Sequence, residues 1–198
     1  MRLFVAVMPP GVALTELGDA VDALRALPGA DGLRWTERAG WHVTLAFLGE
    51  VGEDLLPGLV ERLDRAARRH HPFGTGLAGG GRFGDRTLWA GLDGRSRPDG
   101  RNGQEMARVA EAAQAAARRA GVHYEDEHDR FHAHLTLARQ RGHHGRVGLR
   151  PFTDALAAFR GTPWTADSIA LVRSHPPAPG VPGAQPRYER LRTCPLGH

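Results

Sequence analysis

The stretch Trp41-His42-Val43-Thr44-Leu45 is matched, much later in the chain, by Ala133-His134-Leu135-Thr136-Leu137, so the tetrapeptide His-x-Thr-Leu occurs twice. Each copy lies in an apolar run of the kind that forms β-strands. Because successive side chains of a strand point to opposite faces, the histidine and the threonine of each copy share one face. The apolar residues between and after them point the other way, into a core. The two copies therefore predict two strands that can present two imidazoles and two hydroxyls to one small acceptor.

The sequence around the motifs predicts an α+β fold. Strands are expected where short apolar runs occur, at 2–7, 33–36, 41–48, 87–92, 131–138, 168–172 and 188–191. Helices are expected where apolar residues recur at helical spacing, at 12–27, 55–63, 102–120 and 152–159. Loops are expected at 74–84, 93–103 and 176–186. We therefore expect one domain over residues 1–198, made of two similar halves that each supply one His-x-Thr strand.

The glycine-rich segment 74–84 needs a separate interpretation, because glycine-rich loops can hold phosphates. No Gly-Lys-Ser or Gly-Lys-Thr comes after its glycines, and no strand-to-helix Gly-x-Gly-x-x-Gly context surrounds them. We therefore interpret the segment as a hairpin or bulge loop. The next segment, 93–103, is rich in Gly, Arg and Asp and is typical of an exposed loop.

The composition indicates a soluble intracellular protein. Apolar residues make up 41% of the 198 residues, and no apolar run approaches the ~18 residues of a membrane span. The apolar N-terminal run is interrupted by Pro9-Pro10, so an opening strand is expected rather than a signal peptide. Cys194 is the only cysteine, which excludes an internal disulfide and fits a reducing cytoplasm. We expect a cytoplasmic protein with no membrane partner.

All 26 basic residues are arginines, and the net charge is +4. The planar arginine fork suits phosphate contacts, which makes a nucleic acid or a nucleotide a plausible partner. Because acidic residues are mixed among the arginines and the net charge is small, a general replacement of lysine by arginine explains most of them. Charge alone therefore does not identify a partner.

The histidines also raise the alternative of a metal site. His132 and His134 form a His-x-His pair on one strand face, a spacing used by zinc hydrolases. The third ligand would have to be His42 or a carboxylate, but neither motif contains a carboxylate, and the threonines would have no role. We therefore expect no metal and no cofactor. Two core histidines, each satisfied by a hydrogen bond, are the remaining alternative, and the repetition of the motif weighs against it.

The paired motifs resemble the 2H phosphoesterase superfamily, and more closely its RNA 2′,3′-cyclic phosphodiesterases, also known as LigT-like 2′-5′ RNA ligases. The likeness extends along the chain through 2–10, 34–36, 41–49, 88–91, 130–139 and 188–189. Ala133 departs from the proline that usually precedes the second histidine, and His132 stands where a basic residue is frequent. The extended 93–103 loop leaves the substrate range open. The resemblance implies a bilobal, pseudo-symmetric α+β fold with two antiparallel sheets, outer helices and a central cleft.

The resemblance also implies an activity, the metal-independent hydrolysis of RNA 2′,3′-cyclic phosphate ends to 2′-phosphomonoesters. His42 would donate a proton to the leaving ribose oxygen, and His134 would accept a proton from the attacking water. Two imidazoles can take these opposite roles near neutral pH because their ordinary pKa is ~6.5. Thr44 and Thr136 would stabilise the charge that builds on the phosphate oxygens. The near symmetry of the motifs leaves open which histidine is the acid.

Three further residues are candidates for substrate binding. By resemblance Arg139 contacts the phosphate, but its odd offset from His134 would turn it to the opposite face of a regular strand. It would then have to act from the end of the strand or after a bend. Phe4 and Trp41 could stack on a base, although core packing is the stronger expectation for both.

The expected partner is RNA or an oligonucleotide with a 2′,3′-cyclic phosphate end, bound by a monomer. Two alternatives stay open. One is an enzyme of the same fold that acts on another cyclic or 2′-5′-linked phosphodiester, including reversible 2′-5′ RNA ligation. The other is a non-catalytic module that binds RNA ends.

Overall fold

The structure is a computed structural model that describes residues 1–93, 102–123, 131–141, 146–177, 180 and 184–197, with side chains from 104 onward in the second of these ranges. Residues 94–101 of the loop expected at 93–103 lie outside the described residues, as do 178–179 and 181–183 of the loop expected at 176–186. Residues 102 and 103 begin α3.

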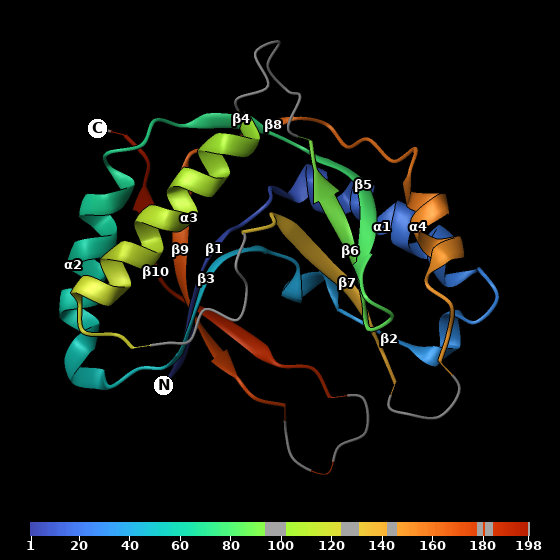
Figure 1. Cartoon of the computed structure of the whole chain (residues 1–198), viewed down its shortest axis with the longest axis horizontal. Helices are drawn as coiled ribbons and strands as arrows, with labels where there is room; N and C mark the ends of the chain where they lie inside the picture. The colour runs from blue at the N-terminus through green and yellow to red at the C-terminus, as the bar shows by residue number, and fades with distance from the viewer. Residues whose placement is uncertain (94–101, 124–130, 142–145, 178–179, 181–183, 198) are drawn as a thin grey trace.

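The described residues form an α+β fold (Figure 1). The helices are α1 (Gly11–Arg25), α2 (Leu56–Ala67), α3 (Asn102–Arg119) and α4 (Arg150–Leu156). The strands are β1 (Arg2–Val7), β2 (Leu33–Trp35), β3 (Val43–Glu50), β4 (Phe73–Thr75), β5 (Leu77–Phe83), β6 (Thr87–Leu92), β7 (His134–Gln140), β8 (Trp164–Ala166), β9 (Ser168–His175) and β10 (Arg187–Pro195). The four predicted helices and seven predicted strands are all present, with shifts at their ends.

The main sheet consists of two antiparallel halves. Its strand order is β10-β9-β1-β3-β7-β6-β5, with β2 also paired to β7. Strands β3 and β7 pair through one residue pair, Val43 with Leu135, whereas the other neighbours pair over several residues. We name β10, β9, β1 and β3 the first half-sheet, and β7, β6, β5 and β2 the second half-sheet. The predicted α+β class with two antiparallel sheets is confirmed, and the two sheets join where the motif strands meet.

The two half-sheets do not correspond to the two halves of the sequence. Strands β2, β5 and β6 precede β7 in the chain by a long way yet join it in the second half-sheet, while the C-terminal β9 and β10 join β1 and β3. The helices are divided in the same way (Figure 1): α2 and α3 pack beside the first half-sheet, and α1 and α4 beside the second. Each half of the molecule is thus assembled from both ends of the chain.

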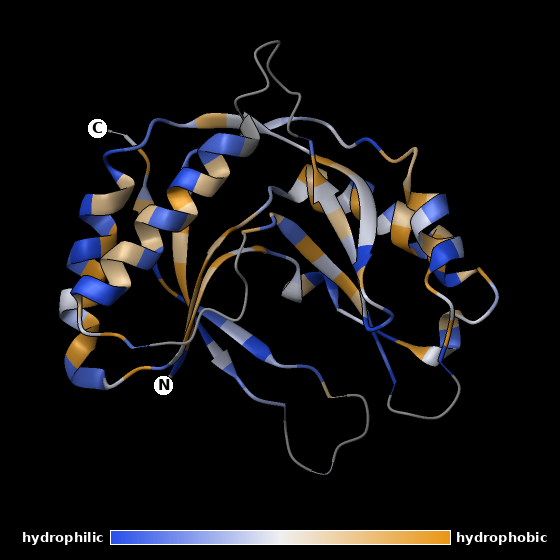
Figure 2. Ribbon diagram, in the orientation of Figure 1, coloured by the Kyte–Doolittle hydropathy of each residue, from blue (hydrophilic) through white to orange (hydrophobic). Residues whose placement is uncertain are grey.

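The core lies between these helices and the sheet. Figure 2 shows hydrophobic residues concentrated along the central strands and hydrophilic residues on the outer faces of the helices. Val5 on β1, Leu17 on α1, Leu59 on α2 and Leu135 on β7 are fully buried. Among the described residues, no helix has the length and apolar character needed to span a bilayer.

The interpretation of 74–84 as a hairpin or bulge loop holds only in part. The segment contains Gly74 and Thr75 of β4 and the whole of β5, so most of it is strand. Strand β5 does form a hairpin with β6, and its register shifts between Leu77 and Gly80.

Two glycines of this segment, Gly80 and Gly81, are needed for packing within the sheet. Gly81 lies opposite Trp89 of β6, and a Cβ at Gly81 would come within 2.3 Å of the indole ring. The absence of side chains lets Trp89 lie across β5, where glycine in a strand marks a close approach of another group.

Gly80 provides a test of this packing. A Cβ at Gly80 would lie 2.6 Å from the carbonyl oxygen of Trp89 and 2.6 Å from Leu156 Cδ1. Gly80→Ala should therefore lower the free energy of unfolding by about 1–3 kcal/mol, since the crowded group is backbone. The matched control is Gly18→Ala in α1, where the added methyl meets no atom within 4 Å and should stabilise by up to about 1 kcal/mol. Urea unfolding of both variants measures the difference, and equal effects would contradict the packing argument.

Candidate active site

The contact between β3 and β7 brings the two motifs together. The four motif residues are His42, Thr44, His134 and Thr136. Val43 pairs with Leu135 in the antiparallel sense, and both are fully buried on the core side. Continuing this register by one residue each way places each histidine opposite the threonine of the other motif. All four side chains are therefore on the face away from the core, and all four are half-buried.

His42 is held in an aromatic setting. Its ring stacks on Phe4 of β1 at a centroid distance of 4.5 Å, and the edge of Tyr188 from β10 meets it at 5.2 Å. Tyr188 can approach because residue 40 is a glycine, where a Cβ would lie 3.2 Å from Tyr188 Cε2. Burial is the main cause that lowers the pKa of His42 to about 4. A hydrogen bond with the backbone of Gly40 raises this pKa, and the charge of His134 lowers it. His42 is thus neutral in the free protein at neutral pH.

His134 is oriented by a backbone hydrogen bond. Its Nδ1 lies 2.7 Å from the carbonyl oxygen of His132. Because a carbonyl can only accept, Nδ1 must carry the hydrogen, which leaves the Nε2 lone pair of a neutral ring able to accept a proton. The edge of Phe83 packs against the ring at 4.7 Å, and Trp89 lies at 6.2 Å. The tautomer fixed in this way is the one that a general base requires.

A register shift in β3 sets the orientation of the residues beyond the first motif. Across the β1–β3 pairing, Ala6 lies opposite Thr44 and Val5 lies opposite Ala46, so Leu45 is an extra residue. The shift reverses the alternation of β3, and the next pair places Phe47 directly opposite Phe4. Because paired residues share a face, Phe47 lies on the same face as the Phe4 ring that stacks on His42. The Phe47 side chain is 61% exposed.

The second motif has the same shift at the equivalent position. Thr136 lies opposite Trp89 and Ala138 lies opposite Leu88, so Leu137 is the extra residue of β7. Arg139 then pairs with Thr87. Thr87 and Trp89 are two residues apart on β6 and share a face, and Trp89 pairs with Thr136. Arg139 therefore lies on the same face as Thr136. The odd offset of Arg139 from His134 therefore does not turn it away from the motif face. The structure resolves the geometric objection to Arg139, because the strand is not regular.

Arg34 and Tyr188 also adjoin the site. The family likeness includes both, at 34–36 and 188–189, but the sequence alone indicates no role in the site for either of them. Arg34 of β2 lies directly opposite Arg139, so both guanidinium groups leave the same face. Burial raises the pKa of the Tyr188 hydroxyl, while the positive charges of Arg139, Arg2 and Arg34 act to lower it. These arginines are therefore near the Tyr188 ring, whose edge contacts His42. Tyr188 links the first motif to the arginines of the second half-sheet.

The two predicted base contacts Phe4 and Trp41 are not supported, since the described geometry gives both rings packing roles. Each side chain is only 4% exposed. Phe4 stacks on His42, and the Trp41 indole N–H donates to the carbonyl oxygen of Thr36 at 3.1 Å. Burial of this extent leaves too little of either ring accessible for a base to stack on it. Phe47, on the same face of the sheet, is exposed instead.

His132 lies at the rim of the site. Its exposed ring is 4.7 Å from Trp89 and 6.2 Å from His134, measured between centroids. In the part of the chain that the structure describes, no three His, Cys, Asp or Glu side chains are grouped closely enough to hold a metal ion.

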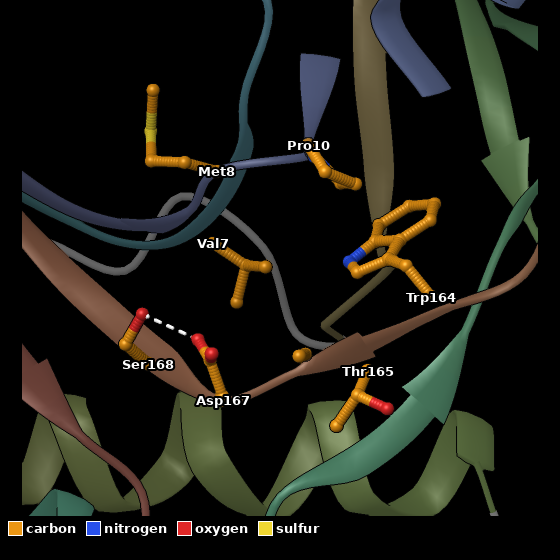
Figure 3. A pocket seen from close by; sticks show the side chains of 8 residues that line it. Val7, Met8, Pro10, Trp164, Thr165, Asp167 and Ser168 are labelled. Carbon is orange, nitrogen blue, oxygen red and sulfur yellow. Dashed lines mark hydrogen bonds between the residues drawn. The ribbon is translucent and has the colours of Figure 1, made fainter. Parts of the chain in front are cut away.

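A hollow of about 170 Å³ lies elsewhere, between the end of β1 and the bend from β8 to β9 (Figure 3). Val7, Met8, Pro10 and residues 164–168 line it. The carboxylate of Asp167 accepts a hydrogen bond from the Ser168 hydroxyl at 2.9 Å within its wall. None of the four motif residues lines this hollow, so the candidate active site is the exposed face of the β3–β7 junction.

Comparison with known proteins identifies the family. Residues 7–89 match the family model described as LigT like Phosphoesterase. A protein named RNA 2′,3′-cyclic phosphodiesterase from Archaeoglobus fulgidus is 31% identical over 148 residues, which cover 70% of this chain and 72% of that protein. One of the same name from Thermus thermophilus is 30% identical over 181 residues, covering 88% and 82%. The chain belongs to the LigT-like phosphoesterase family.

Solved structures agree with this membership. The crystal structure of TT0787 from Thermus thermophilus superposes with a TM-score of 0.74 at 28% identity, over 99% of this chain and 98% of that one. The crystal structure of LigT from E. coli complexed with 3′-AMP has the same fold, with a TM-score of 0.68 at 24% identity, over 100% and 98%.

The low pKa of His42 predicts how stability depends on pH. The folded-state pKa of about 4 lies below the ordinary 6.5, so between these values the unfolded chain binds more protons than the folded one. Neutral His42 contributes on the order of 3 kcal/mol to the free energy of unfolding. This contribution is fully present above pH 6.5 and is lost as the pH falls to about 4. Urea unfolding from pH 4 to 7.5 should show this slope in the wild type and a smaller one in His42→Gln. Identical slopes would show that His42 is not buried in the neutral form.

Proposed function

We propose that this protein hydrolyses the 2′,3′-cyclic phosphate end of RNA to a 2′-phosphomonoester, without a metal ion. The observation that carries the proposal is the placement of the four motif residues on one exposed face across the β3–β7 junction. Two imidazoles and two hydroxyls on one face suit proton transfer around a phosphate. The names of the two similar proteins from Archaeoglobus and Thermus support the same reaction.

The reaction needs one base and one acid. His134 Nε2 takes a proton from water while the water oxygen bonds to phosphorus. The bond between phosphorus and O3′ breaks, and His42 gives its proton to O3′, so the phosphate stays on O2′. Transfers of this kind typically contribute ~10²–10⁴-fold each. The hydroxyls of Thr44 and Thr136 and the guanidinium of Arg139 stabilise the charge on the non-bridging oxygens.

The acid role of His42 depends on the substrate. His42 is neutral in the free protein because burial lowers its pKa. An anionic phosphate placed beside the ring favours the protonated form and so raises that pKa when substrate binds. His42 therefore takes up a proton on binding and releases it to O3′ during the reaction. His134 keeps its Nδ1 hydrogen on the His132 carbonyl oxygen, so Nε2 is the nitrogen that accepts the proton from water.

Phe47 is the aromatic residue we propose as the contact for the nucleobase. It is exposed and lies three residues beyond Thr44, a separation of about 7–10 Å along a strand with one extra residue. This matches the span from the phosphate to the base of one nucleotide. Stacking on an aromatic side chain suits any base, because every base has a π-face.

The catalytic proposal predicts that His42→Ala and His134→Ala each lower kcat on a 2′,3′-cyclic-phosphate-ended oligonucleotide by at least about 10³-fold, because each removes one proton transfer. His71→Ala, at an exposed histidine remote from the motifs, is the matched control and should retain full activity. Product analysis by NMR of the phosphorus should give the 2′-phosphomonoester. Thermal unfolding of each variant checks that the fold is retained.

Other results would redirect the proposal. Full activity in either histidine variant would refute it. Loss of activity on chelation with EDTA, restored by zinc, would favour the His132 and His134 metal site. Turnover of a 2′-5′-linked dinucleotide in preference to the cyclic end would indicate the related phosphodiester or ligation reaction, and tight binding without turnover would indicate an RNA-end-binding module.

Removal of the Phe47 ring should weaken base binding. Phe47→Ala is expected to raise KM about tenfold for a nucleoside 2′,3′-cyclic phosphate and to leave ribose 2,3-cyclic phosphate, which has no base, unchanged. Phe47→Trp should retain the wild-type KM. Val12→Ala, which removes another exposed apolar side chain on α1, is the control. An equal effect of Phe47→Ala on both substrates would contradict a role in base stacking.

A further inference from the structure

Arg34 and Arg139 form a like-charge pair beside the motif face, here named the arginine pair. The two residues are directly opposite each other across β2 and β7, so both guanidinium groups leave the same face, and both side chains are exposed. Arg139 shares that face with Thr136 because of the register shift at Leu137. The arginine pair is therefore continuous with the candidate active site.

The charge of the arginine pair is not neutralised by the described part of the protein. Some other arginines have carboxylate partners, as Arg192 has in Asp64 at 2.7 Å and Arg82 in Asp85 at 2.5 Å. Among the described residues, no carboxylate comes within ion-pair distance of Arg34 or Arg139. Like charges directly opposite in a sheet are destabilising. The arrangement is explained if each guanidinium group meets an anionic group of the ligand in the working protein.

The cyclic phosphate that is hydrolysed needs only one of the two arginines, Arg139. A cyclic phosphodiester has two non-bridging oxygens, and Thr44, Thr136 and Arg139 already supply donors for both. The fork of Arg34 is left for another acceptor. A phosphate is the anion that an arginine fork fits best, since it can accept two parallel N–H bonds.

The position of the pair indicates which phosphate this is. The register of β3 with β7 puts Thr136 beside His42. Arg139 lies three residues beyond Thr136 with Arg34 opposite it, so the pair lies on the His42 side of the site. In the proposed reaction His42 protonates O3′. O3′ is bonded to C3′, and C3′ is bonded to C4′. From C4′ the chain continues through C5′ to the preceding phosphate. The upstream RNA backbone therefore leaves the site toward the arginine pair.

We propose, building on the proposed function, that Arg34 binds the internucleotide phosphate immediately upstream of the terminal cyclic nucleotide. Arg139 serves the scissile phosphate, and Arg34 beside it serves the next one. The ligand class is thus an oligonucleotide of at least two residues. A cyclic mononucleotide lacks the group that Arg34 recognises.

Three substrates test the proposal. They are a nucleoside 2′,3′-cyclic phosphate, a dinucleotide with a 2′,3′-cyclic phosphate end, and the same dinucleotide with an uncharged methylphosphonate linkage. Arg34→Gln should lower kcat/KM about tenfold for the charged dinucleotide, mainly through KM, because a charge-assisted contact is lost. It should change the other two substrates by less than about twofold. The dependence of log(kcat/KM) on log[salt] for the charged dinucleotide should become shallower by about 0.7.

Arg62→Gln on α2, at another exposed arginine, is the matched control and should change none of these quantities. An equal loss on all three substrates would place Arg34 at the scissile phosphate and overturn the proposal, and so would no loss on any. Inactivity of the wild-type protein on all three would refute the proposed function instead. If Arg34→Gln unfolds at the same temperature as the wild type, a loss of fold is excluded as the cause of the lower kcat/KM.

Discussion

The antiparallel contact between β3 and β7 holds the two motifs on one surface. It consists of one residue pair, Val43 with Leu135, which is the strand pairing that joins the two half-sheets. A longer pairing would make a continuous surface, and no pairing would leave the motifs apart. One pair lets the half-sheets diverge while His42 and His134 remain neighbours, close enough for the charge of one to lower the pKa of the other.

The register shifts at Leu45 and Leu137 extend the shared surface beyond the motifs. Both motifs end in a leucine that becomes the extra residue of its strand, and both leucines are buried. Each shift turns the third residue after the threonine onto the motif face. On the first half-sheet that residue is Phe47, and on the second it is Arg139. The same backbone irregularity thus brings an exposed aromatic ring to one side of the motifs and a guanidinium group to the other.

The surroundings of the two histidines are similar in kind but differ in their electrostatic effect. Each ring is packed by aromatic side chains from its own half-sheet, Phe4 and Tyr188 for His42, Phe83 and Trp89 for His134. Burial against Phe4 and Tyr188 keeps His42 neutral in the free protein, whereas a backbone carbonyl fixes the tautomer of His134. Near-symmetric motifs can therefore take opposite roles in one reaction.

The helices, most of the strands and the α+β class could be predicted from the sequence, because they depend on local periodicity. A period of two residues is a local property of a strand, so the sharing of a face by His42 and Thr44 needs no knowledge of the partner strands. Tertiary pairing, in contrast, set which strands are neighbours, made 77–83 a strand beside Trp89, and returned Arg139 to the motif face. These features depend on segments distant in the sequence, because a register shift exists only relative to the partner strand.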